Sequence, residues 1–149
     1  MSRDDGRRAI EAQVLPPLPR VLGTHLLIEL YECDAAFLDR LEAVQTAMEQ
    51  AARFAGATVV ESVFHRFSPH GISGVVVIAE SHLTVHSWPE YRYAALDVFT
   101  CGDKEIPRKI KDQLEEAFGA ARCSTTWLHR GTELFNDETA PHQENPETS

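Results

Sequence analysis

The chain has 149 residues, of which 43% are hydrophobic and 25% are charged, and this composition is typical of a single globular domain with its own core. With 14 Lys and Arg against 23 Asp and Glu, the net charge of −9 argues against binding to duplex nucleic acid and favours cationic small molecules as ligands. No apolar run reaches the roughly 20 residues that span a bilayer, and no signal peptide is recognisable. We therefore expect a cytoplasmic protein without a nucleic-acid or membrane partner.

Two polar tails flank the predicted core. Residues 1–20 mix charged residues with three prolines, and residues 132–149 are acidic and contain no Lys or Arg. Neither segment can bury enough apolar surface to order itself, so we predict a single domain over residues 21–131 between two disordered tails. The three cysteines of the chain have no CxxC spacing, which argues against a disulfide framework or a zinc ribbon.

The first half of the core predicts a strand, a helix and a hairpin. Residues 24–31 alternate as a strand does, and Asp34 is a natural N-cap for an amphipathic helix that ends at Gly56. The β-rich runs 58–67 and 72–79 are separated by Ser-Pro-His-Gly. Proline presets one backbone dihedral and glycine accepts a positive φ, so this sequence predicts the turn of a hairpin.

The second half of the core predicts a strand over residues 93–100, a helix with Pro107 in its first turn, and a last strand over residues 123–129. The order β-α-β-β-β-α-β predicts an α+β fold, a two-layer sandwich with two helices on one face of a mostly antiparallel sheet. Alternating apolar residues also occupy the other face of that sheet. We expect a second copy of the chain to cover it.

The densest cluster of reactive side chains is the segment ESHLTVHSWPE at residues 80–90. In a helix, His82 and His86 would share a face and could bind zinc, but β-branched Thr84 and Val85 lie between them and the HExxH order is absent. In a regular strand, Ser81 and His86 would lie about 16 Å apart. Direct proton transfer between them therefore requires a bend after Ser81.

Two further interpretations stay open on the residues alone. A Ser-His-Asp hydrolase is one, although the GxSxG elbow of such enzymes is absent. The other concerns Cys101, which is either a small buried hydrophobe, the usual fate of a free cysteine, or a thiol that faces a pocket. The following Gly102 favours the pocket, because it predicts a turn at the end of a strand.

Five segments of the core resemble a known family. They are HLLIELYEC at 25–33, FHRF at 64–67, GISGVVV at 71–77, ESHLTVHSWPE at 80–90 and AALDVFTCG at 94–102. In this order and spacing they closely resemble the small prokaryotic S-adenosylmethionine decarboxylase proenzymes. The resemblance covers nearly all of residues 21–131 and leaves only the two tails unmatched.

The resemblance implies a cofactor made from the chain itself, with no pyridoxal phosphate and no metal. Members of the family cut themselves at a Glu-Ser bond, which matches Glu80–Ser81, when the serine hydroxyl attacks the preceding carbonyl to give an ester. His86 matches the base that removes the α-proton of Ser81, and Ser73 matches the residue that assists the acyl shift. Elimination and loss of ammonia leave a pyruvoyl group on residue 81, with residues 1–80 as the second fragment.

The resemblance also implies the decarboxylation chemistry. The pyruvoyl ketone forms a Schiff base with the substrate amine, and Cys101 matches the acid that reprotonates the carbanion after carbon dioxide leaves. Phe67 and Trp88 match positions that stack on adenine, and Glu90 matches the carboxylate that binds the ribose. The implied product is the aminopropyl donor for spermidine synthesis. The implied assembly is a homodimer of processed fragment pairs, with active sites near the dimer interface.

Two alternative functions stay open beside this one. A relative with the same fold and cofactor would decarboxylate arginine or ornithine, neither of which needs an adenine stack or a ribose-binding carboxylate. A non-catalytic relative would bind the nucleoside or regulate an active partner. Such a protein could lose the reactive serine, histidine and cysteine that this chain retains.

Overall fold

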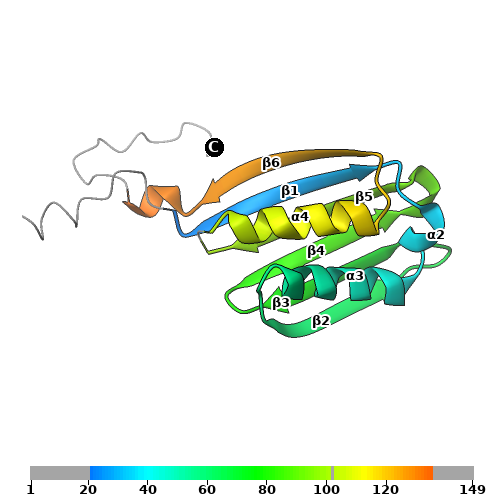
Figure 1. The fold of residues 1–149 in the computed structure, drawn as a ribbon, viewed down its shortest axis with the longest axis horizontal. Coiled ribbons are helices and arrows are strands. Elements are labelled where there is room, and N and C mark those ends of the chain that lie inside the picture. The colour runs from blue at the N-terminus through cyan, green and yellow to red at the C-terminus, as the bar shows by residue number, and fades with distance from the viewer. Residues whose placement is uncertain (1–20, 102, 136–149) are drawn as a thin grey trace, which may run out of the picture.

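The computed structural model describes residues 21–101 and 103–135, which form a six-stranded antiparallel sheet with helices on one face (Figure 1). The strand order is β2-β3-β4-β5-β1-β6. The strands are β1 (Gly23–Tyr31), β2 (Val59–Arg66), β3 (Ile72–Ile78), β4 (Ser81–Trp88), β5 (Tyr93–Thr100) and β6 (Arg122–Arg130). The helices are α2 (Ala35–Leu38), α3 (Leu41–Phe54) and α4 (Glu105–Ala117), with 3-10 helices η1 (Pro89–Tyr91) and η2 (Thr132–Phe135).

The core lies between the sheet and helices α3 and α4, which cover the same face (Figure 1). Side chains alternate across a strand, so every second residue of the central strands points toward the helices. The fully buried core includes Leu26, Ile28, Leu30, Val44, Met48, Ile72, Val76, Leu83, Ile110, Leu114 and Phe118. Burial of these side chains is the main driving force for the fold, and the predicted two-layer α+β class is confirmed.

The predicted long helix is divided in two. Asp34 caps α2 as predicted, because its side chain accepts the backbone N–H groups of the first turn. The helical path stops at Asp39, whose carboxylate accepts hydrogen bonds from Arg66 at 2.7 Å and from the N–H of Gly71 at 3.2 Å. These contacts fasten the break between α2 and α3 to the β2–β3 turn. Gly56 follows α3 with φ of 90°, which agrees with its predicted role at the helix end.

The predicted strand order lacked one strand. Residues 81–88 form β4, which pairs with β3 and with β5, and its register is uninterrupted along the strand. The bend predicted after Ser81 is therefore wrong. The β-branched residues that weakened the zinc-helix interpretation fit this central strand well.

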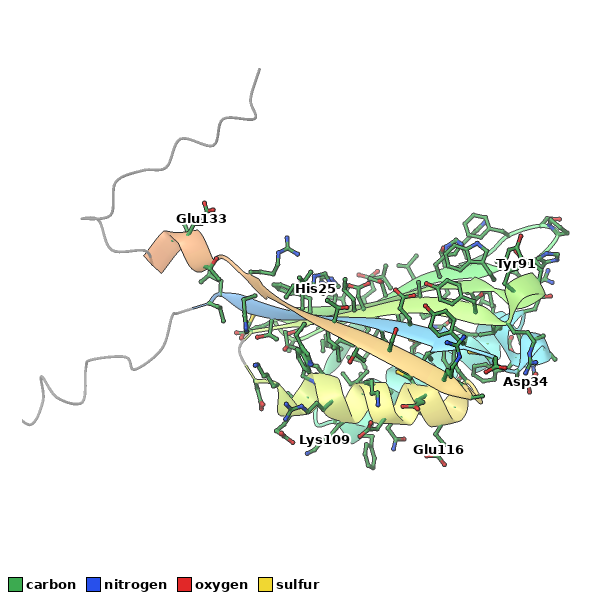
Figure 2. The ribbon with its side chains drawn as sticks, turned by 90° about the horizontal axis from the view of Figure 1, so that it is seen from above. His25, Asp34, Tyr91, Lys109, Glu116 and Glu133 are labelled. Carbon is green, nitrogen blue, oxygen red and sulfur yellow. The ribbon has the colours of Figure 1, made fainter. Side chains whose placement is uncertain are left out.

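The other face of the sheet, here called the open face, carries no helix in the part of the chain that the structure describes. Figure 2 shows Lys109 and Glu116 on the outer side of α4, below the sheet, and His25 above it. Among the apolar residues of the open face, Val63, Val75, Val77 and Leu128 are exposed.

Most residues of the two predicted tails lie outside the ranges that the structure describes. Residues 1–20 and 136–149 lie beyond the described ranges, whereas the first four residues after the predicted core form η2. Across the described ranges, no helix has both the length and the apolar character needed to cross a membrane.

Candidate active site

The predicted cleavage site lies in a tight turn. β3 and β4 are joined by two residues, Ala79 and Glu80, because Ser81 pairs directly with Ile78. Glu80 has φ of 65°, a left-handed conformation that is uncommon for a residue with a side chain and stores backbone strain. The peptide bond between Glu80 and Ser81 therefore sits at a strained entry to the strand.

The thiol of Cys101 contacts that same peptide. Its Sγ lies 3.0 Å from the carbonyl oxygen of Glu80, to which the thiol donates. The register of β4 and β5 explains the contact: His82 opposes Phe99, so the ladder continued by two residues brings Glu80 level with Cys101. Cys101 is exposed, and the structure therefore places it as a thiol at a strand end rather than as a buried hydrophobe.

Ser81 and Cys101 line a cavity of about 240 Å³ at this end of the sheet. Its other walls include Gly56, Ala57 and Thr58 between α3 and β2, Thr100 at the end of β5, Asp103 just before α4, and Ile106 in the first turn of α4. Asp103 is ordered within this wall, because its Oδ1 accepts the N–H of Glu105 at 2.8 Å. Sequence analysis missed Asp103, since nothing local in the sequence indicates that it faces Ser81.

The other predicted processing residues form a second cluster on the open face. Ser73 opposes His86 across the β3–β4 ladder, and Ser73 Oγ and His86 Nδ1 share a hydrogen bond of 2.6 Å. The His86 ring also contacts Trp88, with ring centroids 4.1 Å apart, and lies 6.1 Å from the ring of Phe67. One predicted base and two predicted adenine-stacking residues are thus brought together.

The predicted ribose ligand joins this second cluster through the hairpin turn. Glu90 lies in η1, directly after β4, and its Oε2 is 3.2 Å from Nε2 of His70. His70 belongs to the β2–β3 turn that also carries Phe67. From the sequence, His70 was interpreted only as part of a turn. Its position between Phe67 and Ser73, two predicted site residues, was the signal that could have indicated a role in the site.

The two clusters are separate within one chain. Ser81 faces the helices and His86 the open face, since residues five apart on a strand point to opposite faces. Along the strand they are about 16 Å apart. The cavity at Ser81 has no histidine among its described lining residues, so the predicted histidine base is not supplied there by the same chain.

An aromatic stack borders the second cluster. Trp88 stacks on Tyr93, and Tyr93 stacks on Tyr31, with ring centroids 5.2 and 5.3 Å apart. Burial raises the pKa of the Tyr93 hydroxyl, and its hydrogen bond to the Glu29 carboxylate raises the pKa further. Tyr93 therefore stays a neutral donor at physiological pH.

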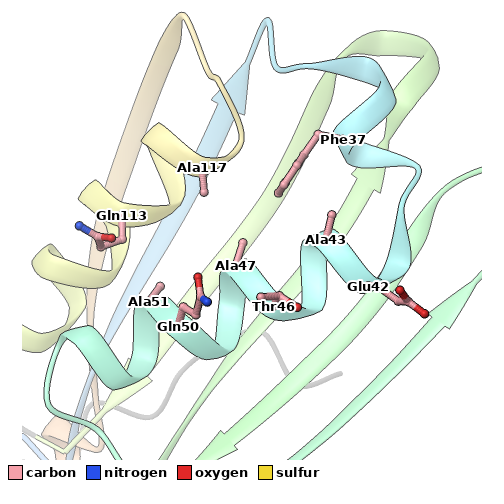
Figure 3. A pocket seen from close by; sticks show the side chains of 9 residues that line it. All are labelled: Phe37, Glu42, Ala43, Thr46, Ala47, Gln50, Ala51, Gln113 and Ala117. Carbon is pink, nitrogen blue, oxygen red and sulfur yellow. The ribbon is translucent and has the colours of Figure 1, made fainter.

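The molecule has a second, larger cavity away from these clusters. A groove of about 440 Å³ runs between α3 and α4, and Figure 3 shows Phe37, Ala47 and Ala117 directed into it. None of the predicted site residues lines this groove. The chemistry-bearing residues are therefore at the ends of β4 rather than in the larger cavity.

Fold and clusters together define a class of protein: a two-layer α+β chain whose reactive serine follows a strained peptide that a thiol contacts. Comparison with known proteins agrees. A family model described as S-adenosylmethionine decarboxylase matches residues 24–131. The S-adenosylmethionine decarboxylase proenzyme of Thermotoga petrophila is 50% identical over 124 residues, which is 82% of this chain and 95% of that protein.

Two further relatives extend the comparison. The protein of the same name from Acidithiobacillus ferrooxidans is 50% identical over 112 residues, 75% of this chain and 84% of that protein. The crystal structure of the adenosylmethionine decarboxylase from Aquifex aeolicus has a TM-score of 0.71 and 36% identity, covering 75% of this chain and 92% of that chain. The chain belongs to the S-adenosylmethionine decarboxylase family, and the resemblance found in the sequence is confirmed.

Proposed function

We propose that this chain is a proenzyme that cuts itself between Glu80 and Ser81 and then decarboxylates S-adenosylmethionine. Membership of the family supports the decarboxylase activity. The observation that carries self-cleavage is the contact between Cys101 Sγ and the carbonyl oxygen of Glu80, at the peptide bond that precedes the serine hydroxyl.

Self-cleavage begins when Ser81 Oγ attacks the carbonyl carbon of Glu80. The C–N bond breaks, the nitrogen of residue 81 takes the hydroxyl proton, and an ester replaces the amide. Negative charge develops on the carbonyl oxygen, where the Cys101 thiol stabilises it. Removal of the α-proton of Ser81 then breaks the ester C–O bond and frees the Glu80 carboxylate. Water finally displaces the nitrogen of residue 81 as ammonia and leaves a pyruvoyl group.

The base for the second step comes, in this proposal, from a second copy of the chain. His86 lies about 16 Å from Ser81 along β4 of the same chain, whose pairing with β3 is uninterrupted, and Ser73 lies opposite His86. A two-fold axis that runs across the strands, between two open faces, reverses the partner's strand direction. The His86 end of one copy then meets the Ser81 end of the other. The exposed valines of the open face, Val63, Val75 and Val77, support such a contact.

The cavity at residue 81 fits a small carbonyl group, because glycine and alanine form part of its wall and leave room beside the strand. A pyruvoyl group supplies there an electron-withdrawing carbonyl that accepts the electrons left when a carboxylate departs as carbon dioxide. Cys101, already beside this peptide, delivers the proton that completes the reaction.

The second cluster binds the nucleoside part of the substrate. Phe67 and Trp88 offer aromatic faces to the adenine and to the sulfonium charge, and Glu90 accepts the ribose hydroxyls. The acidic net charge of the chain favours the cationic substrate. The product is the aminopropyl donor for spermidine synthesis.

The first experiment is an intact mass spectrum of the purified, denatured protein. We expect two fragments, residues 1–80 and 81–149, with the second lighter by one ammonia than a fragment that begins with serine. The Ser81→Ala variant stays one chain, and the matched Ser124→Ala variant, changed at an exposed serine of β6, is cut like the wild type. A wild-type chain that stays whole contradicts the proposal.

The substrate is tested on the cleaved protein by release of carbon dioxide. S-adenosylmethionine is expected to be decarboxylated, and arginine and ornithine are not. Glu90→Gln is expected to raise KM for S-adenosylmethionine, because the ribose hydroxyls lose a charged acceptor. Faster release from arginine or ornithine would instead support the alternative substrates.

A further inference from the structure

Three metal-ligand side chains from three adjacent strands meet on the open face. They are His25 of β1, His82 of β4 and Asp97 of β5, and one donor atom of each lies within 4.8 Å of the other two. Asp97 Oδ2 accepts a hydrogen bond from His25 Nε2 at 2.7 Å and lies 3.7 Å from His82 Nε2. His25 is labelled on this face in Figure 2.

The sheet register fixes this meeting. β5 lies between β4 and β1, and Phe99 of β5 is opposed by His82 on one side and by His25 on the other. Asp97 stands two residues before Phe99 and therefore points to the same face. The Phe99 ring orients both imidazoles: His82 stacks on it at 5.4 Å, and His25 meets it edge-on at 5.6 Å.

The carboxylate is oriented as well. Thr84, beside Asp97 across the β4–β5 ladder, donates its hydroxyl to Asp97 Oδ1 and leaves Oδ2 directed at the histidines. Outer partners of this kind are typical of metal ligands. Tetrahedral zinc with bonds of about 2.1 Å separates its donors by about 3.4 Å. Two of the three donor separations, 2.7 and 3.7 Å, bracket that value and the third lies within 4.8 Å, so side-chain rotations would complete the geometry.

We propose that His25, His82 and Asp97 bind one divalent transition-metal ion of the zinc type. Two imidazole nitrogens and one carboxylate favour such an ion over Mg²⁺ and Ca²⁺, which prefer all-oxygen sites, and water takes the fourth position. The ion replaces the proton on His25 Nε2, and this proton moves to Nδ1. Arg130, which donates to Nδ1 at 3.1 Å, then turns away, as its exposed position at the end of β6 allows.

The site lies on the face of β4 opposite to the Ser81 side chain. His82 follows Ser81 in sequence but points to the opposite face of β4. The role of the ion is to clamp β1 against β4 and β5. His25 belongs to residues 1–80, whereas His82 and Asp97 belong to residues 81–149. The ion therefore also links the two fragments of the cleaved chain, a consequence that, unlike the metal site, rests on the proposed function.

The test is a calorimetric titration of metal-stripped, tag-free, full-length protein with zinc chloride. We expect one Zn²⁺ per chain. His82→Ala is expected to weaken binding at least 10-fold, and Thr84→Val, which removes only the outer partner, by about 10-fold. His65→Ala, an imidazole elsewhere on the open face, is expected to bind like the wild type. A wild type that binds no zinc, or a His82→Ala variant that binds normally, overturns the site.

Two additional measurements separate this proposal from others. The Ser81→Ala chain, which is not cut, is expected to bind zinc as tightly as the wild type, so the metal site is tested independently of self-cleavage. Cobalt substitution is expected to give the absorption of a tetrahedral site without a thiolate charge-transfer band. Appearance of that band would make a cysteine the ligand and overturn the assignment. Thr84→Val serves as the decisive variant if circular dichroism shows that His82→Ala fails to fold.

Discussion

The three cysteines differ in what surrounds them, and this difference decides their chemistry. Cys33 is fully buried, and burial raises the pKa of its thiol to about 11. Burial also raises the pKa of Cys123. Cys101 alone among the three is exposed, and it alone donates to the carbonyl of the proposed scissile bond. The reactive thiol is therefore selected by its position at the end of β5.

Replacement of Cys101 tests its role at the carbonyl. A full oxyanion donor contributes about 100- to 1,000-fold to a rate. A thiol is a weaker donor, so we expect Cys101→Ala to slow self-cleavage by about 10- to 100-fold and Cys101→Ser to retain most of the rate. The measurement is the time course of fragment formation on denaturing gels after refolding, with Cys123→Ser as the matched control. Wild-type cleavage by Cys101→Ala would show that the contact has no role.

Single residues with a local structural meaning were predictable from the sequence. Asp34 caps a helix, and Gly56 and Gly71 adopt positive φ, because their side chains, or the lack of one, determine the local backbone. Residues whose meaning depends on a distant partner were not predictable. His25 meets Asp97 only because β1 pairs with β5. The sequence spacing instead pointed to His82 and His86 as the candidate zinc pair.

Among the elements, α2 and β4 are joined to β3 by one buried hydroxyl. Ser87 of β4 is 1% exposed; its Oγ accepts the N–H of Ile72 at 2.9 Å and donates to the carbonyl of Leu38 at 2.8 Å. Ser87→Ala leaves both backbone groups unpaired, at a cost of about 1–3 kcal/mol. We expect Tm to fall by at least about 4 °C in a calorimetric scan. Ser124→Ala is the exposed control, and equal Tm values for the two variants would contradict this role.

The hydrogen bonds of Asp39 fasten the break between α2 and α3 to the β2–β3 turn, and their contribution to stability is expected to depend on pH. The hydrogen bond from Arg66 lowers the pKa of Asp39 below its usual value of 3.8. The stabilisation that the ionised Asp39 carboxylate provides is complete above pH 3.8 and is lost as the pH falls through the lowered pKa. Asp39→Asn imitates the protonated carboxyl, so its Tm is expected to lie below that of the wild type at neutral pH.

The Tm values of the wild type and of Asp39→Asn are expected to become equal in acid. Thermal melts between pH 7 and about pH 2 are expected to show a wild-type Tm that approaches that of Asp39→Asn below pH 3.8. Asp112→Asn, at an exposed carboxylate of α4, corrects for the general effect of acid. A constant difference between wild type and Asp39→Asn over the whole range would contradict the assignment.

At the scale of elements, the sequence predicted the class of fold better than its details. Helical spacing and alternation indicated two helices over an antiparallel sheet. β4 was not included because its open-face residues, two histidines and a threonine, are polar and were interpreted as a reactive cluster rather than as one face of a strand. The division of the first helix also escaped prediction, since it depends on contacts of Asp39 with a turn about 30 residues away.

The whole molecule offers a direct test of the proposed sharing of active sites. Ser81→Ala retains His86 and Ser73, whereas His86→Ala retains Ser81. We expect neither variant to cut itself alone. When the two are refolded together, the His86→Ala chain is expected to be cut by the base of its partner, in up to about half of the chains if subunits mix at random. Mass spectrometry distinguishes the two chains. No cleavage in demonstrated mixed dimers would place the base elsewhere.

The strand order has a further consequence for the proposed cleavage. Cutting after residue 80 assigns β1, β2 and β3 to one fragment and β4, β5 and β6 to the other. The sheet interleaves them, so that three of the five ladders pairing the described strands, β3–β4, β5–β1 and β1–β6, join the two fragments. The uncut chain forms these ladders in a unimolecular reaction. The same ladders, once lost after cleavage, return only by bimolecular association of fragments with unpaired edges. Folding must therefore precede cutting, and the mature molecule persists because its barrier to unfolding is high.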